Sequence, residues 1–285
     1  MKLSIVIPVY NEKETIRRAV KSIQKQNYCD YELIIGDNNS DDGTKDILNE
    51  IEKEDDRIKV LYNKINIGTL ENIKLLKCET TGIFTSLLGA HDAFEDNYFC
   101  NFIETVKKNP NGVLYYPKCR YYCTNSKKYS KRYSNIETKE LSRHEGMVKV
   151  VNNLVKCGNI YGFIKSDLFK ILPIEKIYGP DDLILFWLAS KGKIHEIDCT
   201  GITMEKPRLE ENSCERLQRY KKEGIIENKL ELLPSLQRKI TGEVHLRYLH
   251  KDKNLTLDEK KWVEKELIKK YLKRYNCSVK PIVDS

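Results

Sequence analysis

Residues 31–44 read YELIIGDNNSDDGT, and this stretch joins two kinds of sequence. Residues 31–35 are mostly apolar and β-branched, which is typical of a buried β-strand. Residues 36–44 then hold three aspartates, two asparagines, a serine and two glycines. Asn, Asp, Ser and Gly are ordinary turn residues, but so many carboxylates also fit a calcium loop or part of a nucleotide site.

Strands and helices alternate around this stretch. Short apolar runs at 3–8, 58–62 and 84–88 predict three further strands, and apolar residues at helical spacing predict three helices between them. We expect Asn11 to cap the first helix, Ser40 or Asp41 to cap the second, and the third to cover about 69–79. This order predicts an α/β fold whose largely parallel sheet binds ligands at the carboxyl ends of its strands. PVYN (8–11), residues 36–44 and GAHD (89–92) all follow such ends.

A calcium loop of the EF-hand type does not fit residues 36–44. Such a loop needs oxygen ligands at positions 1, 3 and 5, glycine at position 6 and glutamate at position 12. Counting from Asp37 puts Asp42 at position 6, and counting from Asn38 puts Asn49 at position 12. A strand, not a helix, also precedes the loop, so a plain turn and a nucleotide site remain.

Four motifs in this order resemble glycosyltransferase family 2, which has the GT-A nucleotide-sugar fold. They are PVYNE at 8–12, DNNSDDGT at 37–44, the N-x-G of residues 66–68, and the turn at 89–92 after the fourth strand. The resemblance covers roughly residues 1–215, and the order and spacing of the motifs make it specific. It implies a GT-A fold and the inverting transfer of a sugar from a nucleotide donor.

The resemblance implies a donor pocket at the strand ends. Tyr10 is expected to stack on the base and Asp37 to accept the imide N–H of the base. A packed aromatic ring and a helix cap are the alternatives for Tyr10 and Asn11. The predicted nucleotide-sugar-binding residues are Pro8, Tyr10, Asn11, Glu12, Asp37, Asn39, Asn66, Gly68 and His91.

The acidic turn departs from the family. A D-x-D or D-x-D-D motif usually holds a divalent metal there, whereas this chain has Gly89-Ala90-His91-Asp92. Asp92 and His91 are the predicted ligands for Mn²⁺ or Mg²⁺, which would neutralise the leaving diphosphate. Alternatively, His91 donates a hydrogen bond to a phosphate or is a simple turn residue.

The catalytic base is predicted where Gly179-Pro180-Asp181-Asp182 opens an apolar helix. By resemblance Asp181 takes the position of the catalytic base, and Asp182 is the alternative. The non-catalytic interpretation is that acidic residues are simply favoured at the start of a helix. Residues 158–165 resemble the family stretch that lines the donor sugar and the acceptor. Lys206 and Arg208 are expected to reach the diphosphate.

Composition indicates a soluble protein with a sizeable core. The 285 residues are 40% apolar and 32% charged, and no apolar run is long enough to predict a transmembrane helix or a signal peptide. Nine cysteines at scattered spacings favour a reducing compartment, and Cys119 and Cys123 lack a second pair at zinc-finger spacing. We therefore expect a cytoplasmic location, with possible placement at the inner face of the membrane.

Two basic segments stand out in a chain of net charge +8. Residues 115–133 interleave tyrosines with lysines and arginines, which fits sugar rings or a membrane interface, and no nucleic-acid-binding motif accompanies them. Near the C-terminus, Thr256 and Glu259 predict a capping box before a basic helix that either packs on the catalytic domain or lies on anionic lipid. The predicted domains are 1–214, divided into a nucleotide-binding half (1–112) and an acceptor half (113–214), and a basic helical extension, 215–285.

These features favour an inverting glycosyltransferase that moves a sugar, from a UDP-sugar by preference, to a glycan or lipid-linked acceptor in surface-polysaccharide synthesis. No nucleic-acid partner is expected. One alternative is a relative that binds nucleotide-sugar or glycan without catalysis, since Gly89 and His91 replace acidic residues. A nucleotidyltransferase is disfavoured because PVYNEKE has no glycine-rich phosphate loop.

Overall fold

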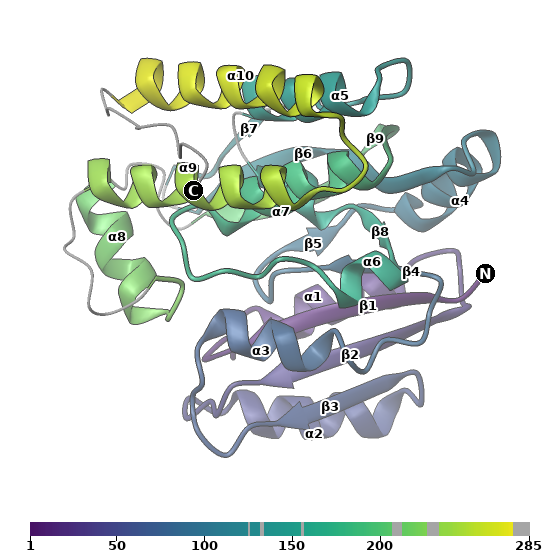
Figure 1. The fold of residues 1–285 in the computed structure, drawn as a ribbon. Helices are drawn as coiled ribbons and strands as arrows, with labels where there is room; N and C mark the ends of the chain where they lie inside the picture. The colour runs from purple at the N-terminus through teal and green to yellow at the C-terminus, as the bar shows by residue number, and fades with distance from the viewer. Residues whose placement is uncertain (125, 132–133, 155–156, 207–212, 227–233, 276–285) are drawn as a thin grey trace.

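A computed structural model describes residues 1–124, 126–131, 134–154, 157–206, 213–226 and 234–275. Its first half alternates strands and helices as predicted (Figure 1). The elements are β1 (Leu3–Val9), α1 (Ile16–Gln24), β2 (Tyr31–Asp37), α2 (Thr44–Glu54), β3 (Ile58–Tyr62), α3 (Thr69–Leu76) and β4 (Phe84–Leu87).

The second half begins with a short strand and a helix and continues into two long neighbouring strands. Its elements are β5 (Ala93–Phe94), α4 (Tyr98–Lys108), β6 (Gly112–Cys123), β7 (Lys128–Lys131), α5 (Arg143–Asn153), a 3-10 helix (Cys157–Tyr161), β8 (Phe163–Lys165), α6 (Ser166–Lys170), α7 (Pro180–Lys191) and β9 (Lys193–Lys206). Three helices follow: α8 (Ser213–Lys222), α9 (Pro234–Lys251) and α10 (Leu257–Tyr275).

The strands join into one sheet in the order β3-β2-β1-β4-β8-β6-β9-β5, with β7 paired to β6. The pairs among β1, β2, β3 and β4 are all parallel, as the alternation predicts. In the second half β6 and β9 are parallel, whereas β8 runs antiparallel to both β4 and β6. The parallel half therefore brings the carboxyl ends of β1, β2 and β3 to one edge.

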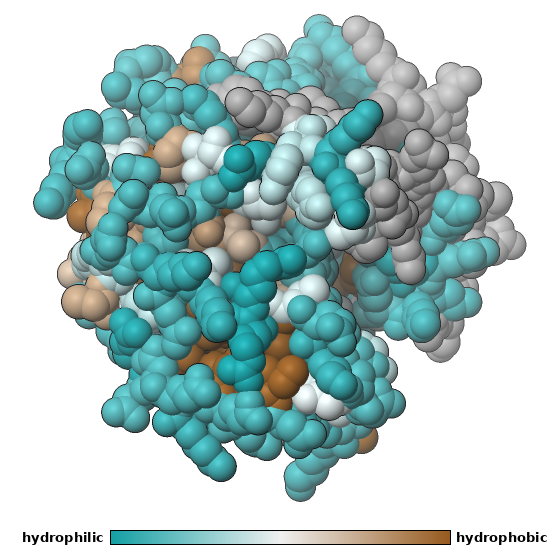
Figure 2. Space-filling view, turned by 180° about the vertical axis from the view of Figure 1, so that it is seen from behind, coloured by the Kyte–Doolittle hydropathy of each residue, from teal (hydrophilic) through white to brown (hydrophobic). Residues whose placement is uncertain are grey.

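Side chains alternate between two hydrophobic clusters, one on each face of the sheet. On β1, Ile5 and Ile7 pack with α1 and α4, while Val6 packs on the other face with α3 and the α5–α7 helices. The surface seen from behind is mostly hydrophilic (Figure 2). Helices therefore cover both faces, which places the polar loops, and any ligand site, at the strand ends.

The basic segment 115–133 forms a β-hairpin for much of its length. Residues 128–131 of β7 pair antiparallel with β6, and Tyr115, Tyr116 and Tyr121 are buried in the core. Tyr129 is exposed, with the Arg120 guanidinium 5.1 Å from its ring centroid. Of the five tyrosines in this segment that the structure describes, three are thus core residues.

The basic C-terminal helix, α10, packs on α5 and α9. Its predicted capping box is confirmed, with Glu259 N donating to Thr256 Oγ1 (3.3 Å) and Thr256 N donating to Glu259 Oε2 (2.7 Å). Val263 and Leu267 are buried in the same cluster as α5 and α7, so its apolar stripe faces protein. Within the described residues, we find no helix with both the length and the apolarity needed to span a membrane.

Candidate active site

Hydrogen bonds join the loop after β1 to the loop after β2. Asn11 Nδ2 donates to Asp41 Oδ1 (2.8 Å), Asp41 N donates back to Asn11 Oδ1 (3.0 Å), and Asn11 N donates to Ser40 Oγ (2.9 Å). Asn11 adopts a left-handed conformation with φ of 55°. Its amide group therefore fixes the two loops against each other, close to the end of the sheet.

Both predicted helix caps are wrong. The N-cap of α1 is Thr15, four residues beyond Asn11, and the N-cap of α2 is Gly43, with φ of 98°. Neither N-cap makes a side-chain capping bond: Thr15 Oγ1 donates to Glu12 instead, and Gly43 has no side chain. Local sequence favoured a cap, and the pairing of two distant loops overrode it.

Asp37 and Tyr10, the predicted base-binding pair, lie at the ends of neighbouring strands. Asp37 is fully buried at the end of β2, opposite Val9, and its two carboxylate oxygens lie 3.3 and 3.2 Å from Ser40 N. Tyr10 is 46% exposed and follows β1 directly, so its ring face is open to a ligand. Pro8 lies in β1 in register with Gly36.

Four asparagines hold the loop after β3 against the end of β2. Asn38 Nδ2 donates to Asn66 Oδ1 (2.7 Å), and Asn38 Oδ1 accepts from Asn63 Nδ2 (3.2 Å) and Ile67 N (3.0 Å). Asn72 Nδ2 donates to the Gly36 carbonyl (2.7 Å). Sequence reasoning missed Asn38, although its place beside Asp37 in a dense polar motif was a signal.

The remaining predicted pocket residues also have internal contacts. Asn66 Oδ1 accepts from Gly68 N at 2.9 Å, so the N-x-G motif closes on itself. Asn39 has φ of 64° and accepts from Lys45 Nζ at 2.9 Å. These contacts support the shape of the pocket wall, and their direct role toward a donor stays a prediction.

His91 forms an ion pair with Glu12 across two loops. His91 Nδ1 lies 2.8 Å from Glu12 Oε1, and Arg18 donates to the His91 carbonyl (2.7 Å) while also pairing with Glu205. The hydrogen bond to Glu12 raises the pKa of His91 to about 9, against a smaller opposing effect of burial, and Asp92 adds to the rise. His91 is therefore a cation at neutral pH.

Asp92 is buried at the base of the same turn. Its Oδ1 accepts from Glu205 N (2.9 Å), which attaches the turn to β9. A Cβ on Gly89 would lie 2.5 Å from Asp92 Oδ2. The Asp92 carboxylate thus occupies the space that a side chain at position 89 needs, which is a physical reason for glycine where the family usually has an acid.

The structure describes no complete set of ligands for the predicted metal site. His91 contacts Glu12 through Nδ1, and its raised pKa means that a metal at Nε2 would first have to displace a proton. In the part of the chain that the structure describes, no group of three or more His, Cys, Asp or Glu side chains is placed to hold an ion. The geometry favours the alternative role of His91, as a cationic donor to phosphate.

The predicted base opens α7. Gly179, with φ of 81°, turns the chain into Pro180, and Asp181 and Asp182 complete the first turn. Burial, with a further contribution from the Asp182 carboxylate, raises the pKa of Asp181 to about 7. A carboxyl group with this pKa is suited to accept a proton near neutral pH.

Tyr161 connects the acidic turn to the base helix. Burial raises the pKa of its phenol well above the usual value, and the carboxylates of Asp92 and Asp181 act in the same direction. Both carboxylates therefore act on one side chain of the 3-10 helix, although 89 residues separate them in sequence. Tyr161 falls within the predicted 158–165 stretch, whereas the side chain of Lys206 and all of Arg208 lie outside the described residues.

These observations define the class of the protein. A parallel half-sheet has a buried aspartate and an exposed tyrosine at its strand ends, a cationic histidine beside them, and a carboxyl group of raised pKa that faces the same region. This is the layout of a nucleotide-dependent α/β enzyme fold with the ligand at the carboxyl edge.

Comparison with known proteins makes the class specific. The model of glycosyl transferase family 2 matches residues 4–169, more than half of the chain, and the chain therefore belongs to this family. The prediction from the four motifs is thus confirmed.

Two curated relatives show the range of similarity. A GalNAc(5)-diNAcBac-PP-undecaprenol beta-1,3-glucosyltransferase of Campylobacter jejuni is 43% identical over 63 residues, which cover 22% of this chain and 20% of that protein. The Escherichia coli UDP-Glc:alpha-D-GlcNAc-diphosphoundecaprenol beta-1,3-glucosyltransferase WfgD is 30% identical over 113 residues, or 40% and 44% of the two chains. The matched segments thus span less than half the length of either relative.

The fold extends beyond these segments. A crystal structure of Staphylococcus aureus TarS 1–349 aligns with 97% of this chain and 82% of its own, with a TM-score of 0.59 and 17% identity. The same TarS fragment has been solved in complex with UDP and with UDP-GlcNAc. The likeness confirms the predicted GT-A fold.

Proposed function

We propose that this protein is an inverting glycosyltransferase that moves a sugar from a nucleotide-sugar donor, with a UDP-sugar favoured, to a glycan or lipid-linked acceptor in surface-polysaccharide synthesis. The observation that carries the proposal is that the carboxylates of Asp92 and Asp181, from opposite halves of the fold, both act on the Tyr161 phenol. Both glucosyltransferases are named for lipid-diphosphate acceptors, which supports the acceptor class.

The reaction follows from the two sides of the site. Asp37 and Tyr10 hold the nucleoside, and the His91 cation faces the diphosphate. Asp181 accepts the proton of the acceptor hydroxyl as the oxygen of that hydroxyl forms a bond to the anomeric carbon. The bond from that carbon to the diphosphate oxygen breaks, and the nucleoside diphosphate leaves with the electron pair. Attack opposite the leaving group inverts the configuration.

Partial compensation of charge supports a phosphate-facing role for His91. Glu12 neutralises part of its charge and keeps it protonated, while Arg18 holds the carbonyl of the same residue and takes up the charge of Glu205. We assign no step to a metal, and dependence on Mn²⁺ or Mg²⁺ stays a prediction that the binding experiment below tests.

Thermal stability measured with UDP, GDP, TDP and CDP, each with Mn²⁺, Mg²⁺ or EDTA, tests the donor site. A ligand of the folded state raises the melting temperature, and 100 times its Kd gives about 2.7 kcal/mol. We expect a rise with UDP, and a rise that survives EDTA supports the assignment to His91. A rise that requires metal supports Asp92 as a ligand, and no rise with any nucleotide contradicts the donor site.

Transfer itself is tested with radiolabelled UDP-sugars and lipid-diphosphate or glycan acceptors. Wild-type activity with loss in Asp181→Asn supports the mechanism, and unchanged activity in that variant contradicts it. Nucleotide binding without transfer or donor hydrolysis under any condition favours the alternative of a non-catalytic binding relative.

We also propose that the protein works on the cytoplasmic side of a membrane, where it meets lipid-linked acceptors. Cys29, Cys78, Cys100, Cys119 and Cys199 are thiols, as expected in a reducing compartment. Since the apolar stripe of α10 packs on protein, any contact of this helix with anionic lipid rests on its lysines. Sedimentation with vesicles containing phosphatidylglycerol, at low and high salt, tests this: binding that salt weakens supports it, and no binding contradicts it.

A further inference from the structure

Two C-terminal helices, which lie beyond the family match, contact both sides of the candidate active site. On the donor side, Thr69 N donates to the Glu223 carbonyl (3.2 Å) just after α8. Gly68 and Gly224 both have positive φ, and a Cβ on Gly68 would lie 3.5 Å from Gly224 Cα. The N-x-G loop therefore packs directly against the backbone that follows α8.

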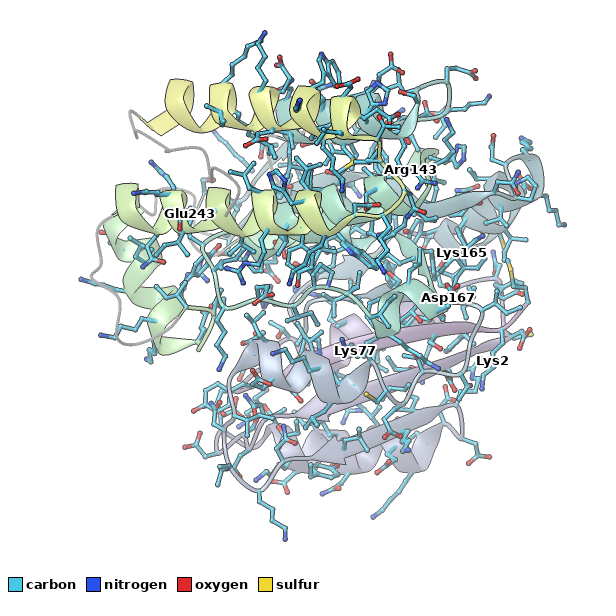
Figure 3. The ribbon with its side chains drawn as sticks, viewed as in Figure 1. Lys2, Lys77, Arg143, Lys165, Asp167 and Glu243 are labelled. Atoms are coloured by element: carbon cyan, nitrogen blue, oxygen red, sulfur yellow. The ribbon has the colours of Figure 1, made fainter. Side chains whose placement is uncertain are left out.

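On the base side, α9 holds the loop that leads into α7. Thr241 Oγ1 lies 2.7 Å from the Tyr178 carbonyl, three residues before Asp181. Val244, one helical turn further along α9, packs in a buried cluster with Ile177 and Leu183, which flank the base. Figure 1 shows α9 alongside α7, and Figure 3 labels Glu243 on α9.

His245 extends this contact to the first turn of α7. Its Nδ1 lies 2.8 Å from the Thr241 carbonyl, and since a carbonyl only accepts, Nδ1 carries the hydrogen. Its ring centroid is 5.2 Å from that of Phe186. Burial lowers the pKa of His245, while the Thr241 carbonyl and Asp182 act in the opposite direction. A neutral imidazole thus fills the space beside Asp182.

The base loop depends on contacts from outside it. Residues 172–179 form neither helix nor strand, so no ladder of backbone hydrogen bonds fixes them. A general base has to lie within hydrogen-bond reach of its proton, and a displacement of about 1 Å can cost about 100-fold in rate. Contacts with α9 are therefore in a position to decide whether Asp181 is aligned.

We propose that α9 is a positioning element of the active site, in which Thr241 and His245 fix the loop and first helical turn that carry Asp181. The proposal rests on the proposed function, because Asp181 has to be the base. It assigns the C-terminal segment a role in catalysis, with α8 and α9 joining the donor loop to the base loop.

The experiment compares variants of the full-length protein at position 241. Thr241→Val keeps the shape and removes the hydroxyl, and Thr241→Ser restores the hydroxyl. Thr241 Oγ1 also lies 3.0 Å from the carbonyl of Gln237, four residues earlier in α9. Thr105→Val in α4 is the matched control, since Thr105 Oγ1 likewise donates to the carbonyl four residues earlier (2.8 Å) but does not contact the base loop. His245→Gln is a second, independent probe of the same contact.

Three readouts are measured for each variant: kcat against pH, UDP binding, and hydrogen exchange of amides 177–183. We expect Thr241→Val to lower kcat about tenfold, to speed exchange in that segment, and to leave UDP binding within twofold. The acid limb of the kcat profile should move to lower pH as water reaches Asp181. The titratable groups that interact with Asp181 are Asp182 and Tyr161. His245 interacts with Asp182, and Lys270 in turn acts on His245.

The outcomes separate the two proposals. Wild-type values in Thr241→Ser and Thr105→Val, with the expected changes in Thr241→Val and His245→Gln, support positioning. A lower melting temperature in Thr241→Val with unchanged kcat, acid limb and local exchange overturns it and leaves only a structural role. A wild-type enzyme without transfer activity refutes the proposed function, whereas the exchange data still report whether α9 holds the loop.

Discussion

Replacing Asp181 by Asn is predicted to stabilise the protein while it abolishes transfer. Burial and the Asp182 carboxylate raise the pKa of Asp181 from 3.8 to about 7. The folded state therefore holds this proton more tightly than the unfolded state. Stability falls as the pH rises from about 4 to about 7, and the full penalty is present above pH 7.

The magnitude follows from the pKa difference. Each pKa unit corresponds to about 1.4 kcal/mol, so the ionised carboxylate costs at most about 4 kcal/mol above pH 7. An asparagine side chain has nearly the same shape and no charge, but burying its amide costs about 1–3 kcal/mol. We expect a net gain of about 2 kcal/mol at pH 8, or a rise of about 4–8 °C in the melting temperature, and a much smaller gain at pH 5.

The assay is thermal or urea unfolding of both proteins at pH 5 and pH 8. Asp167→Asn is the matched control, because Asp167 is also the second residue of a helix, α6, but is exposed (Figure 3). Its loss removes a favourable interaction with the helix dipole, about 0.3–1 kcal/mol, at both pH values. A gain for Asp181→Asn that is equal at pH 5 and pH 8, or a loss at pH 8, refutes the reasoning.

Other predictions concern the loops of the donor side. Glu12→Gln should lower the melting temperature relative to wild type at pH 6.5, and the difference should shrink by pH 10. The raised pKa of His91 gives a stabilisation that is fully present below pH 6.5, the ordinary pKa of histidine, and that is lost as the pH rises through about 9. A constant difference contradicts the ion pair. Gly36→Ala should destabilise by about 1–3 kcal/mol in urea unfolding, because the added Cβ would lie 2.7 Å from Asn72 Oδ1, and a change below about 0.5 kcal/mol contradicts this packing. Asn38→Leu should weaken UDP binding in calorimetry and destabilise the fold by about 1–3 kcal/mol, because it leaves polar groups of the neighbouring loop unpaired. Unchanged UDP affinity shows that the asparagine network does not shape the pocket.

The local alternation of strands and helices was predictable because each element carries its own signal. Apolar runs of five to seven residues mark β1, β2 and β3, and helical spacing marks α1 and α2. Motifs at strand ends led to Asp37 and Tyr10, because parallel topology sends such ends to one edge, whereas the resemblance of residues 179–182 to the family led to Asp181. The pairing of these residues with a ligand stays a prediction.

Contacts between distant segments could not be predicted in the same way. The caps failed because Asn11 bonds to the next loop, and nothing in the sequence indicated that Glu12, 79 residues from His91, holds a proton on that ring. The burial of Tyr115, Tyr116 and Tyr121 also escaped sequence reasoning, since the alternation of β6 between faces depends on which strands lie beside it.

The sequence by itself determined the family, the order of the first four strands and the positions of the acidic loops, because these depend on periodicity and on short motifs. Tertiary structure decided which groups act on one another: Asp92 and Asp181 on Tyr161, Glu12 on His91, and α9 on the loop of the base. The physical reason is that charge, proton affinity and hydrogen bonding depend on distance in space, and folding alone brings together groups that lie tens of residues apart in the chain.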